Sequence, residues 1–205
     1  MKTVVVEDEL GPFEGRSSNG VEHDGQHVWV ATGEVLHAID PVKREVVREL
    51  DVEADAGTAF DGTHLYQLTG TEIRKIDPST GETVRSIPAP NGGGAGLTWA
   101  EGALWVGQYR ARKIVRVDPE TGEVTKTLES GRFVTGVTWS SGELWHATWE
   151  SEHSDIRRID PADGKVLERY DAPDGVTITG LAKDGERFYA GSGSSGKVRV
   201  LRPEG

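Results

Sequence analysis

The residues best suited to bind a ligand gather in three predicted loops of the second half of the chain. Tyr109 and Trp149 each follow a predicted strand, and Phe133 precedes another. Aromatic rings with a few convergent polar groups are typical of small-ligand clefts. We therefore predict a cleft for a small molecule or peptide. Its lining residues would be Tyr109, Arg110, Arg132, Phe133, Trp149 and His153. The structural alternative is that these side chains only cap longer loops.

His146, Glu150 and Glu152 are the residues that could transfer a proton. His146 stands in a predicted strand where the other repeats have an aliphatic residue or glutamine. An imidazole there could be a general base or a metal ligand, or a buried group bonded to a backbone carbonyl. Glu150, Glu152 and His153 carry ligand atoms suited to a divalent cation, although their spacing matches no known metal motif. We predict no cofactor and no metal site, with a divalent cation as the alternative.

A short pattern recurs five times and defines the architecture that must position these residues. Each copy has a glycine in a first strand, an aromatic residue in the next strand and a proline turn further on. The glycines are Gly20, Gly57, Gly96, Gly136 and Gly180, and the aromatic residues are Trp29, Tyr66, Trp105, Trp145 and Tyr189. The turns are Asp40-Pro41, Asp77-Pro78, Asp118-Pro119 and Asp160-Pro161, with Arg202-Pro203 in the fifth position. A period of roughly 40 residues with several short strands is typical of β-propeller blades.

We predict an all-β, five-bladed β-propeller with four-stranded antiparallel blades, forming one domain over residues 1–205. The blades are expected at residues 20–50, 57–88, 96–129, 136–171 and 180–202. Their strands are termed A to D from the axis outward. The last blade lacks a strand D, and the N-terminal strand 3–8 stands before Gly20 as strand D of each blade stands before the next glycine. This strand is therefore predicted to close the ring on the last blade.

The two faces of such a propeller differ in their connections. The tight A–B and C–D turns share one face, here called the turn face, and the B–C and D–A connections share the other, the loop face. Gly33, Gly70 and Gly193 follow strand B in three blades, whereas Tyr109 and Trp149 take this position in blades 3 and 4. Functional residues concentrate on variable loops held by a rigid scaffold. The cleft is therefore expected on the loop face near blades 3 and 4.

The composition excludes several classes of partner. The chain of 205 residues has a net charge of −11, which argues against binding to nucleic acid or to an anionic membrane. It contains no cysteine, so the redox compartment stays open. The apolar run at 4–6 is too short for a signal peptide. We expect a soluble, monomeric, cytoplasmic protein, although a mature secreted domain would have the same composition.

The repeat resembles two families of propeller enzymes. The stretches that carry the resemblance are 96–99, 104–106, 116–123, 144–149 and 160–164. They look like blades of the plant- and bacterial-type glutamine cyclotransferases, which are five-bladed and convert N-terminal glutamine to pyroglutamate, and of the seven-bladed streptogramin B lyases. In the cyclotransferases a Gln or Glu typically precedes the glycine of certain A strands. The corresponding residues here are Asn19, Ala56, Ala95, Thr135 and Thr179.

Two classes of function follow from these observations. The leading hypothesis is a small binding or interaction scaffold with its ligand site on the loop face. The resemblance implies the alternatives: a glutamine cyclotransferase-like enzyme, in which His146, Glu150 or Glu152 would transfer the proton, or a streptogramin lyase-like enzyme with a metal-assisted site.

Overall fold

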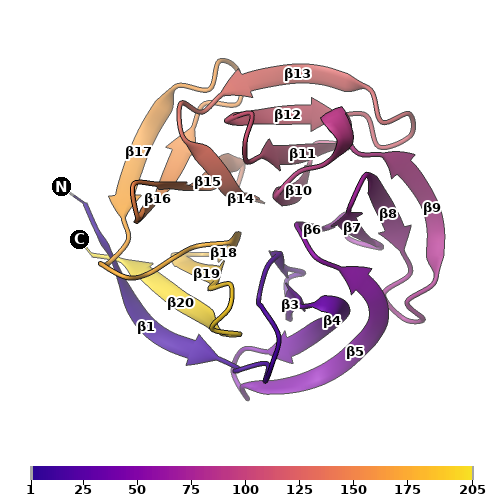
Figure 1. Cartoon of the computed structure of the whole chain (residues 1–205), viewed down its shortest axis with the longest axis horizontal. Coiled ribbons are helices and arrows are strands. Elements are labelled where there is room, and N and C mark those ends of the chain that lie inside the picture. Colours follow the sequence, from indigo (N-terminus) through magenta and orange to yellow (C-terminus); the bar gives the residue numbers. More distant parts are fainter. Residues whose placement is uncertain (1, 205) are drawn as a thin grey trace.

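The structure is a computed structural model that describes residues 2–204. Twenty strands form five four-stranded antiparallel sheets, which stand like blades around a central axis (Figure 1). Within the described range the only helical segment is the 3-10 turn η1 (Pro90–Gly92). No helix among these residues has the length and apolar character needed to span a bilayer. The predicted all-β, five-bladed propeller is confirmed.

The strands follow the chain from blade 1 to blade 5. Blade 1 contains β2 (Val21–His23), β3 (Val28–Ala31), β4 (Gly33–Asp40) and β5 (Glu45–Ala54). Blade 2 contains β6 (Thr58–Phe60), β7 (Leu65–Thr69), β8 (Glu72–Ile76) and β9 (Thr83–Pro88). Blade 3 contains β10 (Gly96–Ala100), β11 (Ala103–Gln108), β12 (Lys113–Val117) and β13 (Val124–Glu129). Blade 4 contains β14 (Phe133–Ser140), β15 (Glu143–Glu150), β16 (His153–Ile159) and β17 (Val166–Asp171).

The N-terminal strand closes the ring, as predicted. Blade 5 contains β18 (Gly180–Asp184), β19 (Arg187–Gly191), β20 (Val198–Pro203) and, as its outer strand, β1 (Val4–Leu10). β1 runs antiparallel to β20, with Val4 opposite Pro203 and Leu10 opposite Val198. Figure 1 shows the two ends of the chain side by side at this blade. Because β1 completes the last blade, the closed ring leaves only short strand edges, which lie at the outer rim.

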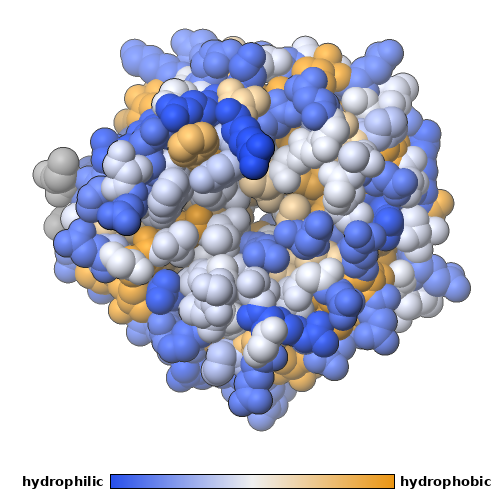
Figure 2. All heavy atoms as spheres, in the orientation of Figure 1, coloured by the Kyte–Doolittle hydropathy of each residue, from blue (hydrophilic) through white to orange (hydrophobic). Residues whose placement is uncertain are grey.

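The repeated glycines allow the five inner strands to meet. A Cβ atom at Gly20 would lie 2.0 Å from the carbonyl oxygen of Ala56, in the next blade. At Gly57 it would lie 2.3 Å from the backbone nitrogen of Leu97, and Gly96, Gly136 and Gly180 approach the following blade in the same way. No side chain fits in these gaps, so the repeat requires glycine there. Around this ring Figure 2 shows a mostly hydrophilic rim and a narrow opening at the centre.

The hydrophobic core is divided into five clusters, one between each pair of neighbouring blades. Each cluster contains the strand-B aromatic residue of one blade packed against aliphatic or aromatic residues of the next. Trp105 of β11, for example, packs with Leu144 and Ile159 of blade 4. The recurring aromatic residues are therefore core residues, because burying such a ring is among the largest single contributions to packing.

The C–D turns are uniform because each is held by the aspartate that begins it. In blade 3 the Asp118 carboxylate accepts hydrogen bonds from the backbone N–H groups of Glu120 (2.8 Å) and Thr121 (3.0 Å). Gly122 then takes a positive φ of 79°. Asp40, Asp77 and Asp160 hold the other three turns in a similar way. The C–D turns are therefore regular, and the irregular connections lie on the loop face.

Candidate ligand-binding surface

Three aromatic side chains predicted to line a cleft lie together on the loop face. Tyr109 follows β11, Phe133 begins β14, and Trp149 lies near the end of β15. The rings of Tyr109 and Phe133 are stacked with their centroids 4.7 Å apart, and the Trp149 ring lies 6.4 Å from that of Phe133. All three side chains are partly exposed. They present an apolar aromatic surface across the boundary between blades 3 and 4.

An ion pair holds the middle of this aromatic surface. The guanidinium of Arg112 lies 4.3 Å from the centroid of the Phe133 ring, and its Nη2 lies 3.0 Å from Oε1 of Glu150. Such a cation–π contact orients the ring, and the carboxylate neutralises the cation. Glu150, expected as a site acid, therefore serves to fix Arg112.

A cavity of about 270 Å³ adjoins the aromatic surface. Its walls are the segment 91–94 on one side and 108–111 on the other. Buried Gln108 joins the walls by donating to the carbonyl of Pro90 (3.0 Å) and accepting from the Asn91 amide (3.2 Å). The side chain of Arg110 is exposed at the rim and makes no ion pair within residues 2–204. Arg110 is thus available to a ligand.

Arg132, by contrast, is committed to the protein itself. Its Nε donates to Oγ1 of Thr148 (2.9 Å), and its Nη2 donates to the carbonyl oxygen of His153 (3.1 Å). Its side chain is 21% exposed, and Nε also lies 3.8 Å from the carboxylate of Asp155. Arg132 therefore ties the entrance of blade 4 to its B–C turn.

A buried acid with three arginines lies beneath this turn, and the sequence did not reveal it. Asp155 is 1% exposed and accepts two hydrogen bonds from Arg157 (3.0 and 2.9 Å), with Arg169 Nε at 3.0 Å and a further bond from Thr148. Burial opposes ionisation of Asp155, but the bonds from Arg157 and Thr148 outweigh it and lower the pKa. The alternation of charged residues in β16 was the available signal.

His146 is a buried neutral side chain. It is 1% exposed, it stands opposite Arg157 in the sheet, and its Nδ1 has no hydrogen-bond partner in the described part of the chain. Burial, reinforced by the positive charge of Arg157, lowers its pKa to about 3. The imidazole therefore carries no charge at neutral pH.

The remaining candidates lie on an exposed hairpin turn. Ser151 and Glu152 form a two-residue connection with φ angles of 51° and 67°, which is the geometry of a type I′ turn. Glu152 is exposed, and the His153 imidazole, also exposed, lies 3.9 Å from Asp174. Across residues 2–204, no group of three or more His, Cys, Asp or Glu side chains is arranged to hold a metal ion.

The innermost strand of blade 1 carries a second buried acid that sequence reasoning missed. Glu22 in β2 is 8% exposed and accepts a hydrogen bond from its neighbour, the backbone N–H of His23, at 2.8 Å. Burial raises its pKa to about 8. The corresponding residues of the other blades are Ala59, Thr98, Thr138 and Ala182. Only blade 1 of the described repeats therefore places a titratable group at this position.

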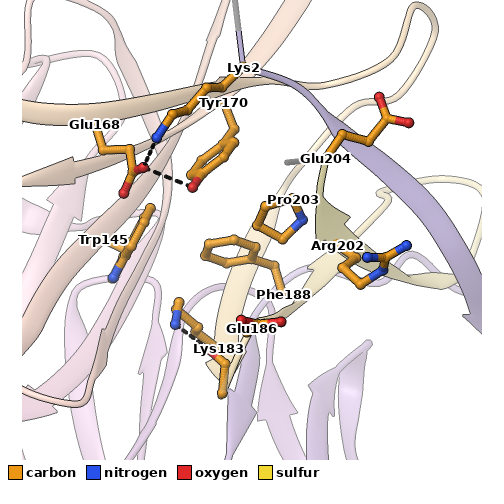
Figure 3. A pocket seen from close by; sticks show the side chains of 11 residues that line it. Lys2, Trp145, Glu168, Tyr170, Lys183, Glu186, Phe188, Arg202, Pro203 and Glu204 are labelled. Carbon is orange, nitrogen blue, oxygen red and sulfur yellow. Dashed lines mark hydrogen bonds and ion pairs between the residues drawn. The ribbon is translucent and has the colours of Figure 1, made fainter.

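A larger cavity, of about 530 Å³, lies on the turn face between blades 4 and 5. Figure 3 shows Trp145, Tyr170 and Phe188 along its apolar side, with Lys2 and Glu168 paired at one edge. The cavity lies at the ring closure, where blade 5 has two chain ends in place of a C–D turn. Glu168 also accepts from the Tyr170 hydroxyl (2.9 Å), and Arg202 lies 3.6 Å from Glu7, whereas Lys183 and Glu186 form no ion pair within residues 2–204.

Known structures share this fold. No family model and no curated protein sequence matches the chain. The crystal structure of Myxococcus xanthus glutaminyl cyclase matches with a TM-score of 0.78 at 19% identity, covering 99% of this chain and 97% of that chain. One chain of a mitotic checkpoint complex (TM-score 0.57, 14% identity, 92% and 75% covered) and one of Kuenenia stuttgartiensis hydrazine synthase (0.54, 18%, 90% and 56%) are also similar.

At these identities the likeness concerns the fold. It confirms the structural resemblance to glutaminyl cyclases that the repeats indicated, and the blade count is five rather than the seven of the streptogramin lyases. This chain is therefore a five-bladed β-propeller of the architecture found in bacterial glutaminyl cyclase.

Proposed function

We propose that this propeller binds a small ligand on its loop face, across blades 3 and 4. The observation that carries the proposal is the partly exposed group of Tyr109, Phe133 and Trp149 beside a cavity with the exposed Arg110 at its rim. Partly exposed aromatic rings next to a concave site provide stacking surface with little loss of side-chain freedom.

The neighbouring groups define what such a ligand would carry. Tyr109 and Trp149 would stack on a planar or apolar group, while Arg110 would orient an anionic substituent. Asn91 offers an amide at the same rim. Arg132 and Glu150 would act indirectly, since both are bonded to the framework. These features favour an aromatic acid, free or as part of a peptide.

A thermal-shift panel of aromatic acids with their neutral amides would test this function, because a ligand of the native state raises the melting temperature. Trp149→Ala should weaken the binding of any acid found by at least about tenfold, as expected for loss of an aromatic anchor. The fold of this variant should persist, because Trp149 is only partly buried. Arg110→Gln is the matched control and should reduce the preference for acid over amide. Unchanged affinity in the Trp149 variant would contradict the proposal.

The match to glutaminyl cyclase favours a second candidate, cyclisation of N-terminal glutamine. In that reaction the α-amine attacks the side-chain amide carbon, ammonia leaves, and a nearby group must accept the amine proton. The channel positions before the glycines offer Asn19, Ala56, Ala95, Thr135 and Thr179, and none of these is an acid or base. We expect no ammonia release from a glutaminyl peptide. Sustained release that is lost in Glu150→Gln or Glu152→Gln would establish the enzyme instead.

A further inference from the structure

Several strand-B aromatic residues make the same kind of hydrogen bond on the turn face. In three blades the indole N–H or phenol O–H donates to a carboxylate in the A–B hairpin of the same blade. The pairs are Trp29 with Asp24 (2.7 Å), Tyr66 with Asp61 (3.1 Å) and Trp145 with Glu143 (3.1 Å). Each acid therefore satisfies a donor that packing would otherwise leave without a partner.

Blade 3 has the donor without the acid. Nε1 of Trp105 is buried and has no hydrogen-bond partner among residues 2–204. The two sequence positions that supply the acid in other blades are both alanine here, Ala100 and Ala103. A buried donor left without an acceptor is destabilising, and native proteins rarely retain one without a reason.

The charged residues around the two tryptophans differ between blades 3 and 4. Arg158 stands opposite Trp145 and pairs with Glu143 (2.6 Å) and Glu168 (3.5 Å). In blade 3 the same register holds Arg116 opposite Trp105, followed by Lys126 in the outer strand. The strands of blade 4 thus place two acids and one arginine around Trp145, and Lys183 of blade 5 lies over the same ring (5.4 Å). The corresponding positions of blade 3 hold Arg116 and Lys126 and neither acid.

The two cations of blade 3 are not neutralised within residues 2–204. Arg116 donates to the Thr125 hydroxyl (3.2 Å) and, at 3.5 Å, to the carbonyl of Glu101, while Lys126 donates to the carbonyl of Pro161 (2.8 Å). Neither forms an ion pair in this range. A concave surface of about 470 Å³ joins these residues with Trp105. Glu101 also lines this hollow, so its lining carries two cations and one carboxylate, a net positive charge in a chain of net charge −11.

We propose that this hollow binds a carboxylate, which takes the place of the acid that blade 3 lacks. One oxygen would accept from Nε1 of Trp105, as Oε2 of Glu143 does from Trp145, and the other would accept from the Arg116 guanidinium, as Oε1 of Glu143 does from Arg158. Lys126 adds a second cation. Charge-assisted bonds of this kind are the strong ones in proteins.

Access to the indole nitrogen requires a local side-chain movement. The nitrogen is shielded from solvent, and Arg116 and Lys126 at the edge of the hollow have long, partly exposed side chains. The incoming carboxylate exchanges their bonds to Thr125 and to the carbonyl of Pro161 for stronger ones to itself. The backbone hairpin does not need to move.

The indole N–H resonances of the protein report directly on this site. In a ¹H–¹⁵N spectrum, titration with succinate should shift the Trp105 indole signal downfield in a saturable way, since a new hydrogen bond forms. Trp105→Phe identifies the signal by its loss. Succinamide, the neutral isostere, should cause no such shift. Trp149 serves as the control for the loop face, and its signal should stay unchanged.

Two variants separate the site from general surface effects. Ala103→Glu places in blade 3 the acid that blade 4 has, on the same type of hairpin, and should weaken succinate binding at least about tenfold by occupying the donors. Glu101→Gln is the matched control: it changes a carboxylate on the rim and should leave binding intact. Arg116→Gln should abolish binding while leaving the buried core unchanged.

Further ligands distinguish the source of the carboxylate and define the results that would contradict the site. A peptide amide with one central aspartate distinguishes an acidic side chain of a partner from a free organic acid, because only a preference for the peptide supports the former. Tighter binding of inorganic phosphate than of succinate would overturn the carboxylate assignment. No saturable shift of the Trp105 signal, or the same shift with succinamide or in the Ala103→Glu variant, would overturn the site.

Discussion

Blades 3 and 4 are built on the same framework and differ in how their charges are balanced. Both have a two-residue A–B turn, a buried tryptophan in strand B and an arginine opposite it. In blade 4 the arginines are paired with acids of the same blade: Asp155 towards the loop face, and Glu143 with Glu168 on the turn face. In blade 3, Arg110 on the loop face and Arg116 with Lys126 on the turn face form no ion pair within residues 2–204, and each proposed binding surface includes one of these two groups of cations. In this repeat protein the residues that build the blade recur, while the balance of charge distinguishes one blade from another.

Removing Asp155 should have the largest effect on this comparison. Asp155→Ala leaves Arg157 and its neighbours without the buried acid that balances them, and breaking such a network typically costs about 3–5 kcal/mol. Urea unfolding would measure the loss. Lys113→Ala, at the same register position of blade 3, is the control. Lys113 is partly exposed and its ion pair with Glu129 is superficial, so a change within about 0.5 kcal/mol is expected. Equal losses in the two variants would remove the distinction between the blades.

Replacing His146 of blade 4 by valine, the residue of blade 3 at this position, should change how stability depends on pH. The unfolded chain protonates this histidine near its ordinary pKa of 6.5, whereas the folded chain does so only near 3. The contribution of this neutral histidine to the free energy of unfolding is therefore fully present above pH 6.5. It is lost as the pH falls from 6.5 towards 3, by about 3 kcal/mol at pH 4. His146→Val, which copies Val106, should remove this part of the loss. Denaturant curves at pH 7 and pH 4 measure it, with His153→Ala as the exposed control.

Removing the turn-face acid from blade 4 or adding it to blade 3 should have the smallest effects on the free energy of unfolding, and these effects should have opposite signs. Glu143→Ala leaves the Trp145 indole and Arg158 without this acceptor and should destabilise the protein by about 1 kcal/mol. Ala103→Glu should stabilise it by a similar amount, because it provides an acceptor for Trp105 and a partner for Arg116. Melting temperatures of the two single variants and the double variant would check this. Destabilisation by Ala103→Glu would show that the hollow does not accept an acid.

The fold could be predicted because its determinants repeat. Gly20 and its four equivalents mark where backbones meet, and the strand-B aromatic residues mark the boundaries between blades. Because the pattern occurs in five repeats, the prediction for each blade is supported by the other four. The sequence also indicates an aromatic surface on the loop face, because Tyr109 and Trp149 stand where other blades have a turn glycine. That this surface lines a ligand cleft stays a prediction. Asp155 and Trp105 were not foreseen as unusual. Their character depends on which arginines or acids face them from other strands, and register is set by pairings far apart in sequence.

The closure of the ring also has a mechanical consequence. Thr3 and Glu204 are bonded to each other, the backbone N–H of Glu204 donating to the carbonyl of Thr3 at 2.9 Å. Tension applied between the two termini would therefore load the hydrogen bonds between β1 and β20 one pair after another rather than all together. Under load the molecule would peel open at this seam, and β1 would detach first while the other four sheets kept their own strands.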